Sequence, residues 1–251
     1  YAPTNRAYKK QAKTYAKSLT ATPPALPGQD TLQMGDQWVG TTNFSVRKPN
    51  FVVIHHTAQN STAQTLKTFT LPRTAVSAHY VIGRDGKVYN MLNDYLRAHH
   101  AGISKWGNNS DLNSSSIGIE LDNNGFEPFS DSQMSSLIQV LGMLKKNYSI
   151  PTANFIGHSD IAPARKVDPN PKFPWKKLAE NGFGFWPDTT TVDSLPAEFN
   201  PQEALRIIGY DVKNLESAIR AFKIHFIQTD VSPFLTEEDK KVLFNVYRKY
   251  Y

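Results

Sequence analysis

The chain has 251 residues, of which 39% are hydrophobic and none is cysteine, and its formal net charge is +6. This length allows one catalytic domain plus a smaller one, and no segment approaches the roughly 20 apolar residues of a membrane span. The lack of cysteine excludes disulfides and thiolate metal sites, so any metal ion must be held by His, Asp or Glu.

Residues 1–33 are expected to form a polar N-terminal arm with one helical turn, followed by a proline-rich loop at 23–28. The arm shows no basic-then-apolar signal pattern. An exported protein would therefore have lost its signal before Tyr1, and a lipid anchor would lie outside this sequence. The arm contains four lysines: Lys9, Lys10, Lys13 and Lys17.

Residues 34–190 are predicted to form the main domain, in which strands and helices alternate. Residues 51–54 are apolar on both faces, as in a buried central strand. Residues 78–92 predict two strands around an Asp85-Gly86 turn, which is a strong hairpin signal. Further short strands are expected at 116–121 and 154–157. These elements indicate an α/β sheet covered by helices.

A long helix is expected between the last two strands. Ser130 and Gln133 have the spacing of a capping box, and Lys145 and Lys146 suit the C-terminal end of the helix dipole. One apolar face follows at helical spacing. It contains Met134, Leu137, Ile138, Leu141 and Leu144.

Residues 195–251 are predicted to form a small domain of three helices, after a polar, proline-flanked linker at 186–196. Asn200 and Pro201 are typical of a helix start, and Gly209 can end that helix. A second helix is expected around 215–226, and Thr236 can cap a third. So small a bundle needs support from the main domain or from a ligand.

Six of the seven histidines lie between His55 and His158. A single histidine is most often only a satisfied polar residue, but these two each follow a buried strand, where α/β sheets present ligands. Two histidines and one carboxylate form a common catalytic zinc site. Spacing leaves the carboxylate open between Asp160, which can instead cap a helical turn, and Asp168.

Glu120 lies among apolar residues in the strand expected at 116–121. A buried glutamate is unfavourable by several kcal/mol unless it is paired or faces a polar cleft. It is either half of a buried salt bridge or a general base. Lys166 could stabilise an oxyanion formed near Asp168, or it could be a solvated surface lysine.

Several motifs in order carry a resemblance to a known family. The chain resembles the AmiD-type N-acetylmuramoyl-L-alanine amidases, within the family of type 2 amidases and peptidoglycan recognition proteins. The resemblance covers nearly all of the chain after about residue 35, tail included. The matching segments are FVVIHHTA (51–58), SAHYV (77–81), AHHAGIS (98–104), SIGIEL (116–121), GHSDIAP (157–163), RKVDP (165–169) and FPW (173–175), then GYDV (209–212) and AFKIHF (221–226).

The resemblance implies a fold, an activity and a set of roles. The fold is a central mixed β-sheet flanked by helices, with a helical domain at 195–251 like small peptidoglycan-binding modules. The activity is zinc-dependent hydrolysis of the amide between N-acetylmuramic or anhydro-muramic acid and L-alanine. The Zn²⁺ ligands are His55, His158 and Asp168, Glu120 is the acid/base, and Lys166 assists at the transition state.

Other residues carry weaker expectations. His100, Trp106 and Asn113 are proposed to contact substrate, although Trp106 can instead cover the core and Asn113 can fix the loop before Glu120. His56 and His79 are expected to be structural. His99 departs from the family pattern, which favours an aromatic residue there.

The expected partner is peptidoglycan or a muropeptide. The positive charge suits its carboxylates, while the scattered basic residues argue against nucleic acid. The resemblance also implies a monomer of the bacterial periplasm, with outer-membrane anchoring left open. Two other functions stay open: a non-catalytic recognition module, and an amidase or peptidase that cuts another bond.

Overall fold

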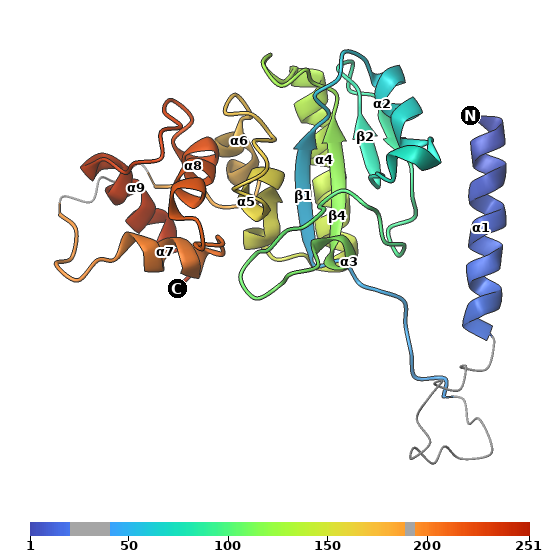
Figure 1. Cartoon of the computed structure of the whole chain (residues 1–251), viewed down its shortest axis with the longest axis horizontal. Helices are drawn as coiled ribbons and strands as arrows, with labels where there is room; N and C mark the ends of the chain where they lie inside the picture. The colour runs from blue at the N-terminus through green and yellow to red at the C-terminus, as the bar shows by residue number, and fades with distance from the viewer. Residues whose placement is uncertain (21–40, 189–193) are drawn as a thin grey trace. The chain divides into compact units, whose positions relative to one another are not determined.

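The computed structural model describes residues 1–20, 41–188 and 194–251, which form two compact units, Tyr1–Val46 and Arg47–Tyr251 (Figure 1). The loop expected at 23–28 and the middle of the linker expected at 186–196 lie outside the described residues. Among the described helices, none combines the length and apolarity needed to cross a membrane.

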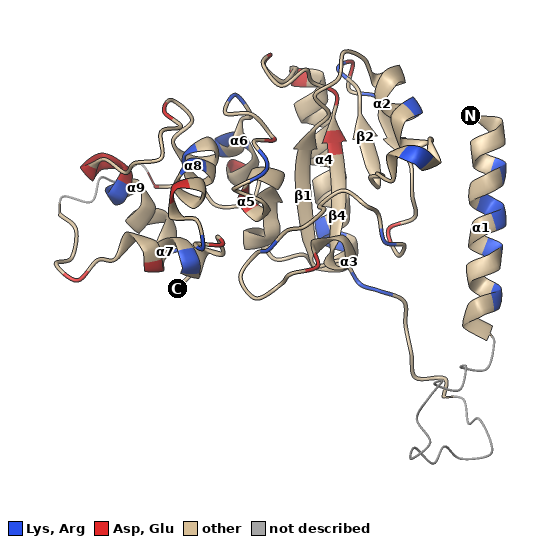
Figure 2. Ribbon diagram, in the orientation of Figure 1, with Lys and Arg blue, Asp and Glu red and all other residues tan. Residues whose placement is uncertain are grey.

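In the described residues of the first unit there is one helix, α1 (Ala2–Thr20), which is much longer than the single turn predicted. Alanine, lysine and glutamine favour the helix, and no glycine interrupts it. None of its residues is buried, and it contains no acidic residue. Its cations, visible in Figure 2, are Arg6, Lys9, Lys10, Lys13 and Lys17.

The second unit is built on a mixed five-stranded sheet in the order β3-β2-β4-β1-β5, which confirms the predicted α/β fold. The strands β1, β4, β5 and β2 run parallel, and β3 pairs antiparallel with β2 through the predicted hairpin. The strands are β1 (Phe51–His56), β2 (Tyr80–Ile82), β3 (Val88–Asn90), β4 (Ser116–Leu121) and β5 (Phe155–Gly157).

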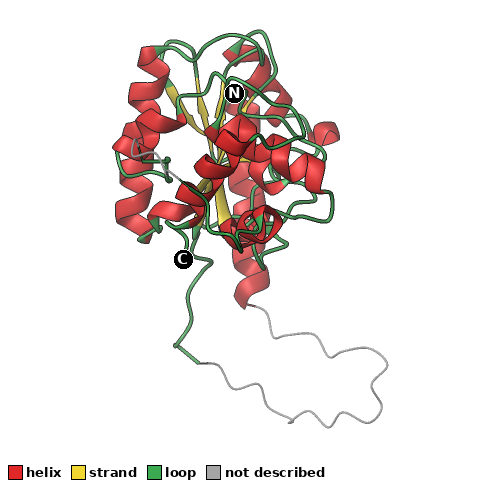
Figure 3. Ribbon diagram, turned by 90° about the vertical axis from the view of Figure 1, so that its left-hand side faces the viewer, coloured by secondary structure: helices red, strands yellow, loops and turns green. Residues whose placement is uncertain are grey.

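Helices cover both faces of this sheet (Figure 3). One core, with Val52, Ile54 and Ile119, packs against the long helix α4 (Asp131–Tyr148) and against α6 (Trp175–Glu180). The short elements are α2 (Thr62–Phe69), η1 (Pro72–Thr74), α3 (Leu112–Ser115), η2 (Thr152–Asn154) and α5 (His158–Ile161).

The start of α4 forms only half of the predicted capping box. The Ser130 side chain accepts a hydrogen bond from the Gln133 N–H, as expected. The Gln133 side chain does not return to Ser130; its amide donates to the carbonyls of Ile82 and Asp122. Gln133 therefore joins α4 to the ends of two strands.

The C-terminal tail consists of α7 (Pro201–Ile208), α8 (Leu215–Phe226) and α9 (Glu237–Tyr247), as predicted. Its apolar side chains, including Phe222, share one hydrophobic core with Val53 of β1 and Ile156 of β5. The tail therefore supplies the cover for one face of the sheet, which is the support that so small a bundle requires.

Candidate metal centre and active site

Alternation along two parallel strands places the polar side chains on one face. In β1, Val53 packs in the core shared with the tail, so His55 projects from the same face. In β4, Ile117 and Ile119 belong to the opposite core, so Glu120 points to the His55 side. His55 and Glu120 are direct partners in the register. Both lie at the carboxyl edge of the sheet, where α/β folds bind ligands.

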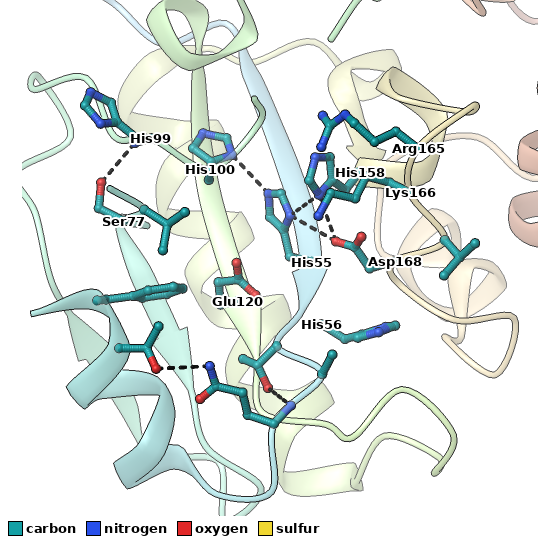
Figure 4. Close-up of a pocket in the computed structure, with 17 residues that line it drawn as sticks. His55, His56, Ser77, His99, His100, Glu120, His158, Arg165, Lys166 and Asp168 are labelled. Atoms are coloured by element: carbon teal, nitrogen blue, oxygen red, sulfur yellow. Dashed lines mark hydrogen bonds and ion pairs between the residues drawn. The ribbon is translucent and has the colours of Figure 1, made fainter. Parts of the chain in front are cut away.

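Three ligand atoms from separate segments converge beside this edge (Figure 4). Nδ1 of His55 lies 2.9 Å from Nδ1 of His158, and Oδ2 of Asp168 lies 3.1 Å and 3.0 Å from these two atoms. All three residues are buried. Within the described residues, this is the group of His and carboxylate side chains that could hold a metal ion.

Second hydrogen bonds fix which ring nitrogens carry protons. Nε2 of His158 lies 3.1 Å from the Ala101 carbonyl, which can only accept, so a neutral His158 ring carries its proton on Nε2 and a lone pair on Nδ1. The Ser116 hydroxyl donates to a carbonyl and accepts from Nε2 of His100, whose Nδ1 lies 3.0 Å from Nε2 of His55. This series of hydrogen bonds leaves Nδ1 of His55 unprotonated too.

The donor set therefore fits a metal ion. Two nitrogen lone pairs and one carboxylate oxygen face one another without a proton between them, an arrangement that a cation stabilises. Burial, with the neighbouring His158, lowers the pKa of His55 to about 4, so its ring is neutral and competent as a ligand. Burial raises the pKa of Asp168, but the close approach of His158 and His55 outweighs burial and holds that pKa below its usual range.

Glu120 lies next to this centre as an unpaired carboxyl group. Burial and the nearby Asp168 raise its pKa to about 8, and Lys166 acts in the opposite direction. Its Oε2 atom is buried and makes no hydrogen bond to any described residue. A strongly perturbed, unpaired carboxyl group in a cavity is typical of a catalytic acid or base.

The cavity in front of the centre has a volume of about 440 Å³ and is lined by Glu120, Lys166, His100 and the three ligand candidates. Lys166 thus faces the cavity, as the functional interpretation required. Arg165, which sequence reasoning did not single out, also lines it. Its guanidinium donates to the carbonyls of Ala101 and Ile103 and so holds the loop that orients His158.

The structure corrects the expectation that Trp106 contacts substrate. Trp106 is buried, is absent from the cavity lining, and packs edge-on against Tyr210 of the tail, 5.0 Å between ring centroids. The indole therefore covers the core, which was the alternative left open by the sequence.

Asn113 and His100 both have positioning roles in the structure, while a contact of either residue with substrate stays a prediction. The Asn113 side chain is buried and accepts hydrogen bonds from the N–H groups of His100 and Ala101, which fixes their loop. His100 lines the cavity, but both its ring nitrogens are engaged, by His55 and Ser116. Its ring touches the metal ligand and leaves no nitrogen for substrate.

Hydrogen bonds to the backbone give structural roles to Asp160, His56 and His79. Asp160 points away from the centre and bonds the Gly157 N–H, which leaves Asp168 as the carboxylate. His56 accepts from the Asn170 N–H just beyond Asp168, and His79 accepts from the Gly118 N–H, as expected. His99 is exposed at the cavity edge.

The chain is similar to known proteins in both sequence and structure. A sequence profile of the N-acetylmuramoyl-L-alanine amidase family (Amidase_2) matches residues 45–171. The chain is 36% identical over 209 residues to N-acetylmuramoyl-L-alanine amidase AmiD of Escherichia coli, covering 71% of this chain and 75% of AmiD. It is 39% identical over 103 residues to 1,6-anhydro-N-acetylmuramyl-L-alanine amidase AmpD of Haemophilus influenzae, covering 41% of this chain and 56% of AmpD.

Solved structures agree with these sequence matches. Escherichia coli AmiD, in complex with the substrate anhydro-N-acetylmuramic acid-L-Ala-D-γ-Glu-L-Lys, superimposes with a TM-score of 0.73 at 30% identity, over 84% of this chain and 93% of AmiD. AMPDH3 from Pseudomonas aeruginosa superimposes with a TM-score of 0.74 at 32% identity, over 88% of this chain and 99% of AMPDH3. Both coverages exceed the amidase profile and extend into the helical tail.

Replacing Gly118 with alanine tests how His100 is held. The new Cβ would lie 2.4 Å from the buried His100 ring, so the ring must shift, which disturbs its contact with His55. We expect the free energy of unfolding to fall by about 1–3 kcal/mol in urea denaturation. The control is Gly142→Ala in α4, where the nearest atom is 3.9 Å away; it should stabilise by about 0.5–1 kcal/mol. Equal effects of the two changes would contradict this packing.

Replacing Glu120 with glutamine tests its raised pKa. The folded chain binds the Glu120 proton more tightly than the unfolded chain, so the metal-free wild type should lose stability as pH rises from about 4.5 to about 8. Glu120→Gln removes this loss and should be more stable than wild type at pH 8 by on the order of 1–3 kcal/mol. Thermal melts of chelator-treated protein at pH 5 and pH 8 measure it. The same change at exposed Glu180 should have no such pH dependence.

Proposed function

The chain belongs to the N-acetylmuramoyl-L-alanine amidase family, and from this premise we propose that it is a zinc hydrolase of peptidoglycan. It hydrolyses the amide between N-acetylmuramic or anhydro-muramic acid and the L-alanine of the stem peptide. The observation that supports this most directly is the meeting of His55, His158 and Asp168 beside the unpaired Glu120.

Zinc is the metal that this donor set favours. Two imidazoles and one carboxylate are a usual ligand set of catalytic zinc, with a fourth position open. The ligand atoms lie 2.9–3.1 Å apart, close to the roughly 3.3 Å that tetrahedral bonds of about 2.0–2.1 Å imply. When bound, zinc supplies Lewis-acid polarisation and a more acidic water.

The side chains of this chain then handle the protons. Glu120 accepts a proton at its unpaired Oε2 from the water that attacks the amide carbon, and returns it to the leaving alanine nitrogen. Burial raises the pKa of Glu120 to about 8 in the metal-free chain; with zinc held by His55, His158 and Asp168, the Glu120 carboxylate would be available as a base. The Lys166 ammonium, in the same cavity, stabilises the developing oxyanion.

His100 and Arg165 act through the two histidine ligands, which they position. His100 accepts a hydrogen bond from the Nε2–H group of His55. This bond keeps Nδ1 of His55 free for the metal and makes the His55 ring a better metal ligand. Arg165 and His158 both bond the Ala101 carbonyl, so the guanidinium fixes the plane of the second imidazole. Neither residue needs to contact the scissile bond in this mechanism.

The setting and the tail complete the proposal. A muropeptide substrate places the enzyme in the bacterial cell envelope, and we propose the periplasm. The tail residues 195–251 contain a groove of about 260 Å³ lined by Phe199, Phe244, Tyr247 and Glu203. Half-buried aromatic rings and an acidic rim suit contact with the sugars and amines of peptidoglycan.

Two substitutions separate metal binding from catalysis. Glu120→Gln should keep zinc, by elemental analysis, and lower kcat on purified muropeptides about 10²–10⁴-fold, because the proton acceptor is lost. His158→Ala should lose both zinc and activity. Glu180→Gln, an exposed change of the same kind, is the control.

Mass spectra of the products test the bond that is cut. We expect a sugar with a free lactyl carboxylate and a peptide that begins with L-alanine, with neither formed in chelator. Muropeptide bound but left intact would indicate a recognition module instead. A different new N-terminus would indicate a peptidase acting elsewhere in the stem.

A further inference from the structure

Asp160 is a fully buried carboxylate that the amidase mechanism does not use. Its Oδ2 atom accepts the Gly157 N–H at 2.7 Å and lies 2.8 Å from Nδ1 of His225; its Oδ1 atom accepts the Tyr210 hydroxyl at 2.8 Å. In the described part of the chain, no Lys or Arg forms an ion pair with it. Two of its three partners, Tyr210 and His225, therefore come from the tail.

The helical turn that Asp160 caps contains one proposed metal ligand, His158, and is hydrogen-bonded to another, Asp168. His158 is the first residue of α5. Asp160 accepts a hydrogen bond from the N–H of Gly157, the residue that caps the start of this helix. The Ser159 N–H, in the same turn, donates at 2.7 Å to the carbonyl of Asp168. A displacement of this one turn would therefore move Nδ1 of His158 and Oδ2 of Asp168 relative to His55.

Packing leaves Asp160 and His225 little freedom to move. The His225 ring stacks on Trp175 with 3.8 Å between centroids and an angle of 16°, and it stacks on Phe226 from the other side. A side chain at Gly157 would meet Trp175 and Pro169 at 3.1 Å and 3.0 Å. A well-packed group transmits a shift to its neighbours instead of absorbing it.

A second contact joins the tail to the loop that orients His158. The Gly107 N–H donates to the Gly209 carbonyl at 2.7 Å, and the Lys105 N–H donates to the Ile161 carbonyl at 2.8 Å. The Trp106 ring lies so close to Gly209 that a Cβ there would be 2.4 Å from it. This loop begins at Ala101, whose carbonyl accepts from His158.

We propose that the tail sets the metal affinity of the active site, with Tyr210 and His225 acting through Asp160 as positioning residues for His158 and Asp168. The inference rests on the metal site of the proposed function and goes beyond it. It assigns the tail a role inside the catalytic unit, whether or not the tail also contacts the cell wall.

Zinc affinity of the full chain is the direct test. Tyr210→Phe removes one hydroxyl from Asp160, and His225→Phe removes the imidazole donor while keeping an aromatic ring between Trp175 and Phe226. Tyr251→Phe is the control, because it removes a tail tyrosine hydroxyl that is exposed and makes no hydrogen bond to a described residue. Each protein is stripped of metal and titrated with Zn²⁺ against a chromophoric chelator, and the metal-free melting temperature is recorded alongside.

Changes in groups that support metal ligands typically weaken metal binding by 10–100-fold. Because Asp160 acts through one further turn, we expect about a tenfold weaker affinity in the Tyr210→Phe, His225→Phe double variant and a smaller loss in Tyr210→Phe alone. The control should bind zinc like the wild type.

A double variant that melts lower but binds zinc as tightly as wild type would overturn the proposal, since the contact would then be structural only. So would an equal loss of affinity in Tyr251→Phe, which would indicate an effect that does not pass through Asp160. The wild-type titration keeps the proposed function separate: a chain that binds no zinc refutes the metal site and this inference together. A chain that binds zinc but releases no L-alanyl peptide refutes only the substrate assignment.

Discussion

Two imidazole lone pairs and one carboxylate oxygen are held within 3.1 Å of one another, at Nδ1 of His55, Nδ1 of His158 and Oδ2 of Asp168. Such a group is unfavourable unless a cation fills the space between them, because each donor repels the others. The remaining nitrogen of each ring is already bonded, to His100 and to the Ala101 carbonyl, so neither ring can turn to relieve the repulsion. The surrounding loops are arranged to maintain this constraint.

The strand that supplies Glu120, the proposed acid/base, is less stable because that carboxyl group has no partner among the described residues. On the site face of β4, Ser116 bonds His100, Gly118 leaves room for the His100 ring, and Glu120 stays unpaired. The opposite face of that strand contains Ile117 and Ile119, which anchor it in the core. A site that leaves a buried carboxyl group without a partner therefore depends on a strand whose other face is fully packed.

Strand alternation and motif order were enough to predict the sheet and to choose the residues of the centre, because both are local properties of the sequence. Asp160 and Asp168 could not be separated by spacing, since the choice depends on Tyr210 and His225, about 50 and 65 residues further along the chain. The burial of Trp106 was unpredictable for the same reason: its partner, Tyr210, lies in the tail.

The tail also explains why a carboxylate can be buried beside the metal ligands without competing for the metal. Asp160 is satisfied by an amide, a phenol and an imidazole, so its two oxygens are occupied and turned from the cavity. Without the two tail donors, each oxygen would lose a partner, and a buried carboxylate two residues from His158 would become a rival acceptor. Hydrogen bonding from the tail thus keeps one of two neighbouring aspartates structural and leaves the other free to face the metal position.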